Sequence, residues 1–254
     1  MIDKLGCFAM TGEIKAERQD SVVTITISRP GKLNSVTREM LDDFSEKVSK
    51  LTNDPDILAI IFTGEGQKAF SAGFDLEMIT SLQKEEHHDF FKKLEKTIRI
   101  IRQARHCITT AAVNGYAIGF GAMVVGACDF RFFAENGSFR FPEIDVGVFP
   151  GAGASSNLIH LVGPARAKDI LMTGKTVLAD ECYRIGLADR VVKQEELMPQ
   201  VLEYVDTLIK KDRSILLRTK SLVDAMTGRT VGGADETETT YLEEWLRESD
   251  DVEE

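Results

Sequence analysis

In the first two thirds of the chain, segments with the hydrophobic spacing of β-strands alternate with segments that have the spacing of α-helices. Residues 13–19 and 21–28 alternate apolar and polar positions, which predicts two β-strands. Residues 58–66 form an apolar run that ends in glycines, a pattern typical of a buried strand followed by a tight loop. Residues 109–119 are expected to form a strand and then a loop, and strand character returns at residues 129–134.

Helical patterns fill the intervals between these strands. Ser35 or Thr37 is suited to cap a helix that runs to about Leu51, because a side-chain oxygen can accept a hydrogen bond from the first helical turn. A long helix is expected at residues 84–105, and a further helix carries Met123. From residue 164 onward helices are predicted at 164–172, 178–184, 194–210 and 213–226, with one short strand at 187–192.

This order of elements predicts an α/β protein with a helical C-terminal part. We expect an α/β core at residues 1–193 and a helical region at residues 194–254.

Composition and charge narrow the class of protein. With 254 residues, 43% of them hydrophobic and 28% charged, the chain is long enough to bury a core without disulfide or metal staples. The formal net charge of −10 disfavours nucleic acid as a partner, because phosphate binding requires clustered Lys and Arg. Basic residues recur along residues 84–105, but acidic residues interrupt them, which is typical of a solvated helix face.

The acidic excess is concentrated near the C-terminus. Residues 234–254 hold ten acidic residues and one basic residue, Arg247, whereas the other 233 residues hold 31 acidic and 30 basic side chains. The body of the protein is therefore nearly neutral, and the acidic segment is typical of a solvated terminal helix.

Cysteine spacing and hydrophobic run lengths indicate the compartment. Cys7, Cys107, Cys128 and Cys182 form no C-x-x-C pair and lie at no zinc-ligand spacing from a histidine, so we expect buried free thiols and no metal site. No run reaches the roughly 18 apolar residues of a membrane span. The N-terminal segment lacks the apolar core of a secretory signal. These features predict a cytoplasmic protein that does not associate with membranes.

Three glycine-bearing segments carry the candidate chemistry: residues 68–78, 114–129 and 141–156. Small residues let a ligand approach the backbone closely, and the N–H groups at the start of a helix favour an anionic oxygen. In the third segment Glu143 follows Pro142 and precedes a glycine-rich loop.

Taken together and in this order, the segments resemble the enoyl-CoA hydratase/isomerase family, the crotonase superfamily. The resemblance covers about residues 13–228 and rests on ISRPGKLNSV, AFSAGFDL, AAVNGYAIGFG, ACDFRF, FRFPEIDVGVFPGAGAS and LVGPARAKDILMTGKTVLADECYRIGLADRVV. It implies a crotonase-like spiral of ββα units with a C-terminal helical oligomerisation region. It also implies homotrimers, often paired into hexamers. Family members usually continue past the segment that corresponds to residues 234–254 with a further helix ending in basic residues, so the C-terminus of this chain is expected to be shortened.

The resemblance implies an acyl-CoA thioester as substrate, with coenzyme A as part of it and no separate cofactor. Two backbone N–H groups would hold the thioester oxygen as an oxyanion hole, and they match Ala72 and Phe120. Most family members have glycine at the position of Phe120, so we expect a reshaped wall for the acyl or pantetheine group. The other positions expected to bind substrate are Lys32, Lys68, Gly73, Phe74, Asp75, Gly119, Gly121 and Met123.

The carboxylates bear most directly on the reaction. The family's hydratases use two glutamates, and one of them matches Glu143, whereas the other position, twenty residues earlier, matches Met123. Moving a double bond from the 3- to the 2-position needs a single base, which removes a proton from C2 and returns it to C4. A single Glu143 with a pKa raised by burial suffices for this step. We therefore expect a Δ3,Δ2-enoyl-CoA isomerase, with enoyl-CoA hydratase (a lyase) as the alternative and a non-catalytic acyl-CoA-binding protein as a further one.

Overall fold

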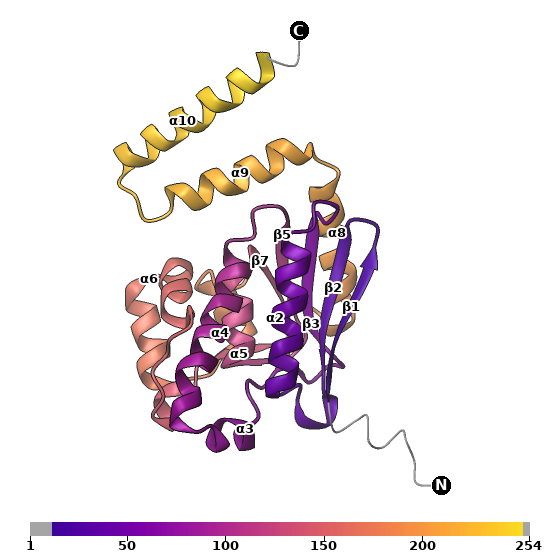
Figure 1. The fold of residues 1–254 in the computed structure, drawn as a ribbon, viewed down its shortest axis with the longest axis vertical. Helices are drawn as coiled ribbons and strands as arrows, with labels where there is room; N and C mark the ends of the chain where they lie inside the picture. The colour runs from indigo at the N-terminus through magenta and orange to yellow at the C-terminus, as the bar shows by residue number, and fades with distance from the viewer. Residues whose placement is uncertain (1–11, 251–254) are drawn as a thin grey trace. The chain divides into compact units, whose positions relative to one another are not determined.

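The computed structural model describes residues 12–250, and the chain divides into two compact units after Asp206. The first unit is built on two β-sheets (Figure 1). The larger sheet has the strand order β1-β2-β3-β5-β7-β10. Only β1 runs antiparallel to its neighbour, and the other pairings are parallel. Its strands are β1 (Glu13–Gln19), β2 (Val22–Ser28), β3 (Ala59–Gly64), β5 (Ile108–Val113), β7 (Phe130–Ala134) and β10 (Arg190–Val192).

The smaller sheet has the order β4-β6-β8-β9, and its strands are two or three residues long. They are β4 (Ala69–Ser71), β6 (Tyr116–Ile118), β8 (Ser138–Arg140) and β9 (Val177–Leu178). Each of the pairs β3/β4, β5/β6 and β7/β8 places its first strand in the large sheet and its second in the small sheet. A helical segment follows each pair, and this repetition confirms the expected spiral of ββα units.

The helices of the first unit follow the hydrophobic pattern closely. Thr37 caps α2 (Arg38–Thr52) by accepting a hydrogen bond from the Met40 N–H at 3.3 Å. The stripe Met40, Leu41, Phe44 and Val48 is buried, as a core-facing helix requires. α4 (Lys84–Arg102) packs beside α2, and α5 (Phe120–Ala127) is buried on nearly every side. Basic side chains of α4 are paired in part, Lys93 with Asp42 and Arg99 with Glu95.

The helix predicted at residues 164–172 begins earlier than expected. α6 (Ala154–Thr173) starts ten residues upstream and is interrupted at Gly163, whose φ of 77° is not helical. Pro164 follows the break, and a proline ring is compatible with the first turn of a new helical segment. The remaining elements are η1 (Pro30–Lys32), α3 (Leu76–Ser81), η2 (Glu143–Val146), α7 (Ala179–Arg184), η3 (Gln194–Glu196) and α8 (Leu197–Ile209).

Packing of α8 explains why the first unit extends past the predicted boundary at residue 193. Val201 and Val205 of α8 are buried. The Tyr204 ring lies 5.0 Å from the ring of Phe130 and 5.3 Å from that of Phe132, both on β7. Most of α8 therefore belongs to the core that the large sheet builds.

The second unit is a helical hairpin of α9 (Arg213–Met226) and α10 (Val231–Asp250). Among its described side chains none is buried, and Ile215, Val223 and Leu242 are large apolar residues left exposed. The Tyr241 hydroxyl contacts the Ser221 carbonyl oxygen across the hairpin at 3.5 Å. The helix expected in the acidic segment is thus present.

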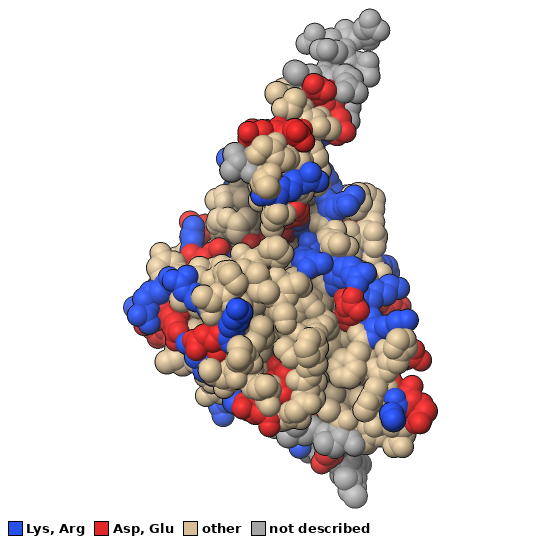
Figure 2. All heavy atoms as spheres, turned by 90° about the vertical axis from the view of Figure 1, so that its left-hand side faces the viewer, with Lys and Arg blue, Asp and Glu red and all other residues tan. Residues whose placement is uncertain are grey.

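Three of the four cysteines lie in the described part of the chain. Cys107, Cys128 and Cys182 are buried thiols that form no disulfide among the described residues, as predicted, and burial raises the pKa of the Cys182 thiol. Cys7 lies outside the described residues. Within residues 12–250 we find neither a helix that meets the length and hydropathy of a membrane span nor a group of side chains suited to hold a metal ion. Figure 2 shows basic and acidic side chains together on one face of the molecule, with uncharged surface between them.

Candidate active site

The three glycine-bearing segments meet at the N-terminus of α5. A Cβ atom built on Gly73 would lie 3.1 Å from the carbonyl oxygen of Ile118 and 3.7 Å from the nitrogen of Phe120. A Cβ atom on Gly119 would lie 3.8 Å from Oε1 of Glu143. Both glycines have positive φ, 91° and 52°, which side chains disfavour. The sequence therefore needs glycine at both positions to bring the two loops and the carboxylate together.

Two backbone N–H groups at this junction are free to bind an anionic oxygen. The N–H of Phe120 is in the first turn of α5, where no intrahelical acceptor exists. The N–H of Phe74 has no acceptor among the described residues. The residues on either side of it form the backbone bridge to Val36: the Val36 N–H donates to the Gly73 oxygen, and the Asp75 N–H donates to the Val36 oxygen.

The expected donor Ala72 is not available in this structure. Its N–H donates to the carbonyl oxygen of Leu33 at 2.9 Å. Because one N–H satisfies one good hydrogen bond, the assignment of this donor by resemblance was wrong, and the free group two residues later, on Phe74, is the candidate.

Polar side chains fix the loop that carries Phe74. The Ser71 hydroxyl donates to the Asn34 carbonyl oxygen at 2.8 Å and accepts from the Gly73 N–H at 3.2 Å. Arg29 binds the Asp75 carboxylate at 2.7 Å, and both side chains are largely buried. This guanidinium lowers the pKa of Asp75. Asp75 also caps α3 by accepting from the Glu77 N–H at 3.0 Å, so its carboxylate orders the loop instead of facing a ligand.

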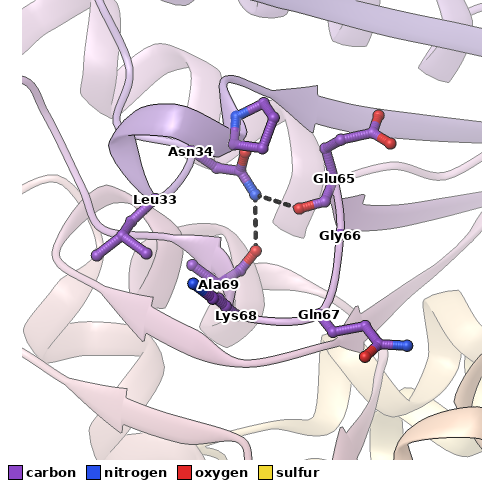
Figure 3. A pocket seen from close by; sticks show the side chains of 8 residues that line it. Leu33, Asn34, Glu65, Gly66, Gln67, Lys68 and Ala69 are labelled. Atoms are coloured by element: carbon purple, nitrogen blue, oxygen red, sulfur yellow. Dashed lines mark hydrogen bonds between the residues drawn. The ribbon is translucent and has the colours of Figure 1, made fainter.

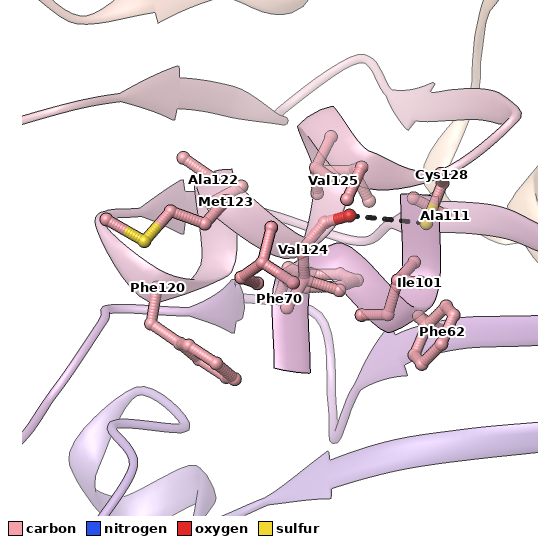
Figure 4. Close-up of a cluster of buried hydrophobic side chains, with 14 of the residues drawn as sticks. Phe62, Phe70, Ile101, Ala111, Phe120, Ala122, Met123, Val124, Val125 and Cys128 are labelled. Carbon is pink, nitrogen blue, oxygen red and sulfur yellow. Dashed lines mark hydrogen bonds between the residues drawn. The ribbon is translucent and has the colours of Figure 1, made fainter. Parts of the chain in front are cut away.

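Aromatic side chains fix the second donor. The Phe120 ring is 1% exposed and lies 5.3 Å from the Phe44 ring and 5.1 Å from the Phe74 ring. Phe74 in turn contacts the ring of Phe90 at 5.0 Å. Figure 4 shows Phe120 and Met123 leaving α5 in different directions. The reshaped ligand wall predicted for Phe120 is therefore wrong, because this ring packs in the core.

Glu143 is the carboxylate of the site. It is the first residue of η2 and is 8% exposed, and its Oε2 has no hydrogen-bond partner among the described residues. Burial disfavours the charged form and raises the pKa of Glu143. A carboxyl group with a raised pKa is suited to accept and return protons near neutral pH. Asp145, the next acid along the chain, is paired with Arg140 at 2.8 Å.

Met123 lies one turn beyond Phe120 on α5 and is 6% exposed. A thioether is a weak acceptor and cannot transfer a proton as a carboxylate does. The position at which the family's hydratases have their second glutamate is therefore occupied here by a buried apolar side chain.

A cavity of about 400 Å³ lies beside the loop that leads to Phe74 (Figure 3). Lys68, Leu33 and Asn34 line it. Lys32 is the residue before Leu33 and is not part of the lining. Glu143 is not among the residues that line this cavity. Gly121 lies behind the site, where a Cβ would be 2.7 Å from the Ser71 oxygen, so it serves packing between β4 and α5.

Two asparagines that the sequence analysis did not single out hold this region. Asn34 donates to the carbonyl oxygens of Glu65 and Ala69 at 3.0 and 2.7 Å, while its own oxygen accepts from the Arg29 N–H. Asn114 exchanges hydrogen bonds with the backbone of Gly64 at 2.8 and 3.1 Å. Both lie in the quoted motifs, but only Asn114, which interrupts the apolar stretch around residues 111–118, carried a signal that could have identified it.

Comparisons with known proteins place this chain in a family. A model of the enoyl-CoA hydratase/isomerase family matches residues 17–253, so the match extends beyond the expected residue 228 into the C-terminal region. The chain is 35% identical over 205 residues to the crotonyl-CoA hydratase of Syntrophomonas wolfei, covering 81% of this chain and 78% of that protein. It is 34% identical over 193 residues to a short-chain-enoyl-CoA hydratase of Clostridium acetobutylicum, with coverage of 76% and 74%.

Solved structures agree with the sequence relatives. An enoyl-CoA hydratase from Bacillus anthracis has a TM-score of 0.86 at 26% identity, covering 91% of this chain and 90% of that one. A Thermobifida fusca structure in complex with acetoacetyl-CoA has a TM-score of 0.84 at 25% identity, with coverage of 94% and 96%. The chain belongs to the enoyl-CoA hydratase/isomerase family, as its motifs predicted.

Proposed function

We propose that this chain is an acyl-CoA enzyme in which Glu143 transfers the proton and the N–H groups of Phe74 and Phe120 hold the thioester oxygen. The observation that carries the proposal is the convergence of the two loops on the buried Glu143 carboxylate, whose Oε2 has no hydrogen-bond partner among the described residues. Negative charge on the thioester oxygen of an enolate would be stabilised by both donors. Preorganised donors of this kind contribute about 3–4 kcal/mol each where charge develops.

Reversible hydration of a 2-enoyl-CoA is the first candidate reaction, because the relatives at 34–35% identity are named for it. In a one-carboxylate version, Glu143 takes a proton from water as the water oxygen bonds to C3. The electrons of the double bond move to the thioester oxygen, and the Glu143 acid then returns the proton to C2. One water is consumed, and Glu143 ends in its starting state.

Isomerisation of a 3-enoyl-CoA, our first expectation from the sequence, is the second candidate. The observation in its favour is Met123, which removes the second carboxylate that would help orient water. The relatives' names do not support it. Glu143 alone could carry a proton from C2 to C4 of the dienolate.

The CoA part of the substrate is assigned to the cavity beside residues 65–69. Lys68, which lines the cavity, and Lys32, which is next to the lining residue Leu33 in the sequence, would supply positive charge for its phosphates. A near-neutral protein body presents no general repulsion to this polyanion. A structural neighbour holds acetoacetyl-CoA, which supports an acyl-CoA ligand for this fold.

Assembly into trimers or hexamers is proposed from the resemblance, with the exposed apolar residues Ile215, Val223 and Leu242 of the hairpin as the surface to be covered. Sedimentation of the full chain measures the assembly directly. A monomer at micromolar concentration would contradict it.

The reaction is tested with crotonyl-CoA, a 3-enoyl-CoA and a saturated acyl-CoA, with products separated by chromatography. Formation of 3-hydroxyacyl-CoA assigns hydration, formation of 2-enoyl-CoA from the 3-enoyl substrate assigns isomerisation, and binding without product assigns the non-catalytic alternative. Asp145→Asn is the matched control for Glu143→Gln, because both substitutions neutralise an acid of η2. Equal activity in wild type and Glu143→Gln would overturn the proposed role of Glu143.

A further inference from the structure

A second, smaller pocket lies between α4 and the start of α6. Its volume is about 70 Å³, and its polar lining comes from Glu95, Arg99, Arg102, Ser156 and Asn157. None of these residues belongs to the site at Glu143. We call it the distal pocket.

Asn157 is the buried polar group at its base. The residue is 5% exposed, and its amide nitrogen Nδ2 has no hydrogen-bond partner among the described residues. Its oxygen accepts from the Arg102 guanidinium at 3.1 Å. Because a guanidinium only donates, the amide oxygen must face Arg102, and this leaves the NH₂ group turned toward Gly153. A Cβ on Gly153 would lie 3.1 Å from that nitrogen, so the nitrogen meets the pocket lining there.

Positive charge at the distal pocket is incompletely balanced. Arg99 is paired with Glu95, whereas Arg102, an exposed side chain, forms no ion pair in the described part of the chain and donates hydrogen bonds to Asn157 at 3.1 Å and to Ser156 at 3.4 Å. The first turn of α6 adds its own N–H groups, and its N-cap is Gly153, which has no side chain to cap them. The lining therefore matches a small oxyanion such as a carboxylate.

The distal pocket adjoins the C-terminal half of α5, the helix whose N-terminus carries the Phe120 donor. A Cβ on Gly126 of α5 would lie 3.7 Å from Cβ of Asn157. Six residues of helix separate Gly126 from Phe120, a rise of about 9 Å. Met123 lies halfway between them, and its flexible side chain can adapt to a neighbouring acyl chain.

We infer that the distal pocket binds a carboxylate at the far end of the substrate's acyl group. The preferred substrates would then be CoA thioesters of short dicarboxylic acids. The inference rests on the proposed function, since it takes the thioester to lie at Phe74 and Phe120. Arg102, the Asn157 amide and the start of α6 replace the water that the distal carboxylate loses.

Calorimetry with glutaryl-CoA and pentanoyl-CoA tests it, because these thioesters have the same chain length and differ in a terminal carboxylate against a methyl group. The wild type is expected to bind glutaryl-CoA about tenfold more tightly, a difference of about 1.4 kcal/mol. Arg102→Met should bring the glutaryl-CoA affinity down to that for pentanoyl-CoA. Asn157→Asp should do the same by placing a carboxylate in the pocket. Arg105→Met, which removes an exposed charge just past α4, should keep the preference.

Free succinate tests whether the distal pocket binds the carboxylate of a separate small molecule or that of the acyl-CoA. Succinate should bind far more weakly than glutaryl-CoA and compete with it. Equal affinity of the wild type for both thioesters, or a preference that survives Arg102→Met, would overturn the inference and leave the proposed function intact. Failure of the wild type to bind either thioester would overturn the proposed function and the inference together.

Discussion

The loop at residues 71–75 and the loop at residues 118–120 each present a backbone N–H to the same site, but different interactions hold them. The first is tied by hydrogen bonds of Ser71 and by the Arg29–Asp75 ion pair. The second is tied by the Phe120 ring, packed between Phe44 and Phe74. The same requirement, a fixed N–H, is thus met by polar contacts in one loop and by aromatic packing in the other.

The surroundings of each loop explain the difference. The first loop enters α3, a short helix with exposed residues, where charged side chains can be partly solvated. The second enters α5, whose residues are almost all buried, and a polar side chain there would need a partner for every hydrogen-bonding group. Ring packing avoids that cost. The contact between the Phe74 and Phe120 rings joins the two arrangements.

The two loops matter for catalysis only if the Glu143 carboxylate between them transfers a proton. Glu143→Gln is therefore the first test. We expect a fall in kcat of about 10²–10⁴-fold, because general acid–base catalysis contributes that much. In the wild type, kcat/KM should rise with pH through the raised pKa of Glu143 and then level off, because the ionised form is the base. Steady-state rates over a pH series measure both. A pH-independent rate with full activity in Glu143→Gln would contradict the assignment.

Phe120→Ala breaks the aromatic arrangement. Removing a fully buried phenyl ring leaves a cavity next to Phe44, and we expect a loss of about 3–5 kcal/mol in the free energy of unfolding. Denaturant unfolding of the isolated variant gives this value. Phe91→Ala, at a position 40% exposed, is the matched control and should cost much less. Equal losses in both variants would mean that the Phe120 ring does not hold its loop.

Asp75→Asn breaks the polar arrangement. The loss should be about 2 kcal/mol, the range of a hydrogen bond to a charged group, since the buried Arg29 loses its carboxylate. The pKa of Asp75 is lowered in the folded protein, so its stabilisation is present above the unfolded pKa and is lost as pH falls through the folded one. The difference between wild type and variant should therefore shrink in acid. Asp42→Asn, in an exposed ion pair with Lys93, serves as control and should change stability by less than about 1 kcal/mol.

Gly73→Ala tests whether the close approach of the two loops matters for catalysis. A side chain at φ 91° is strained, and its Cβ would also crowd the Ile118 oxygen at 3.1 Å. Gly66→Ala is the control, because Gly66 has φ 80° and no atom within 4 Å of the built Cβ. Both should cost about 1–2 kcal/mol for the backbone alone. Only Gly73→Ala should also reduce kcat, and equal kinetics in the two variants would show that loop spacing is unimportant.

Sequence reasoning identified most elements and the main acid because both are local properties. Period-two and helical patterns depend on neighbouring residues, and they located β2, α2 and α4 to within a few residues. The small sheet was missed, since strands of two or three residues carry too little pattern. The start of α6 was missed because glycines at residues 151 and 153 and the break at Gly163 obscure its period.

By itself the sequence determined which chemistry is present: one glutamate after a proline, a methionine where a second acid was expected, and glycines that allow close backbone approach. Only the tertiary structure decided which groups are free to act. Leu33 takes the N–H of Ala72 and leaves that of Phe74, and Phe44 draws the Phe120 ring into the core. Likewise Arg102 reaches Asn157 across 55 residues. A hydrogen-bonding group is available only when no distant segment has paired with it, and that depends on packing that no local pattern records.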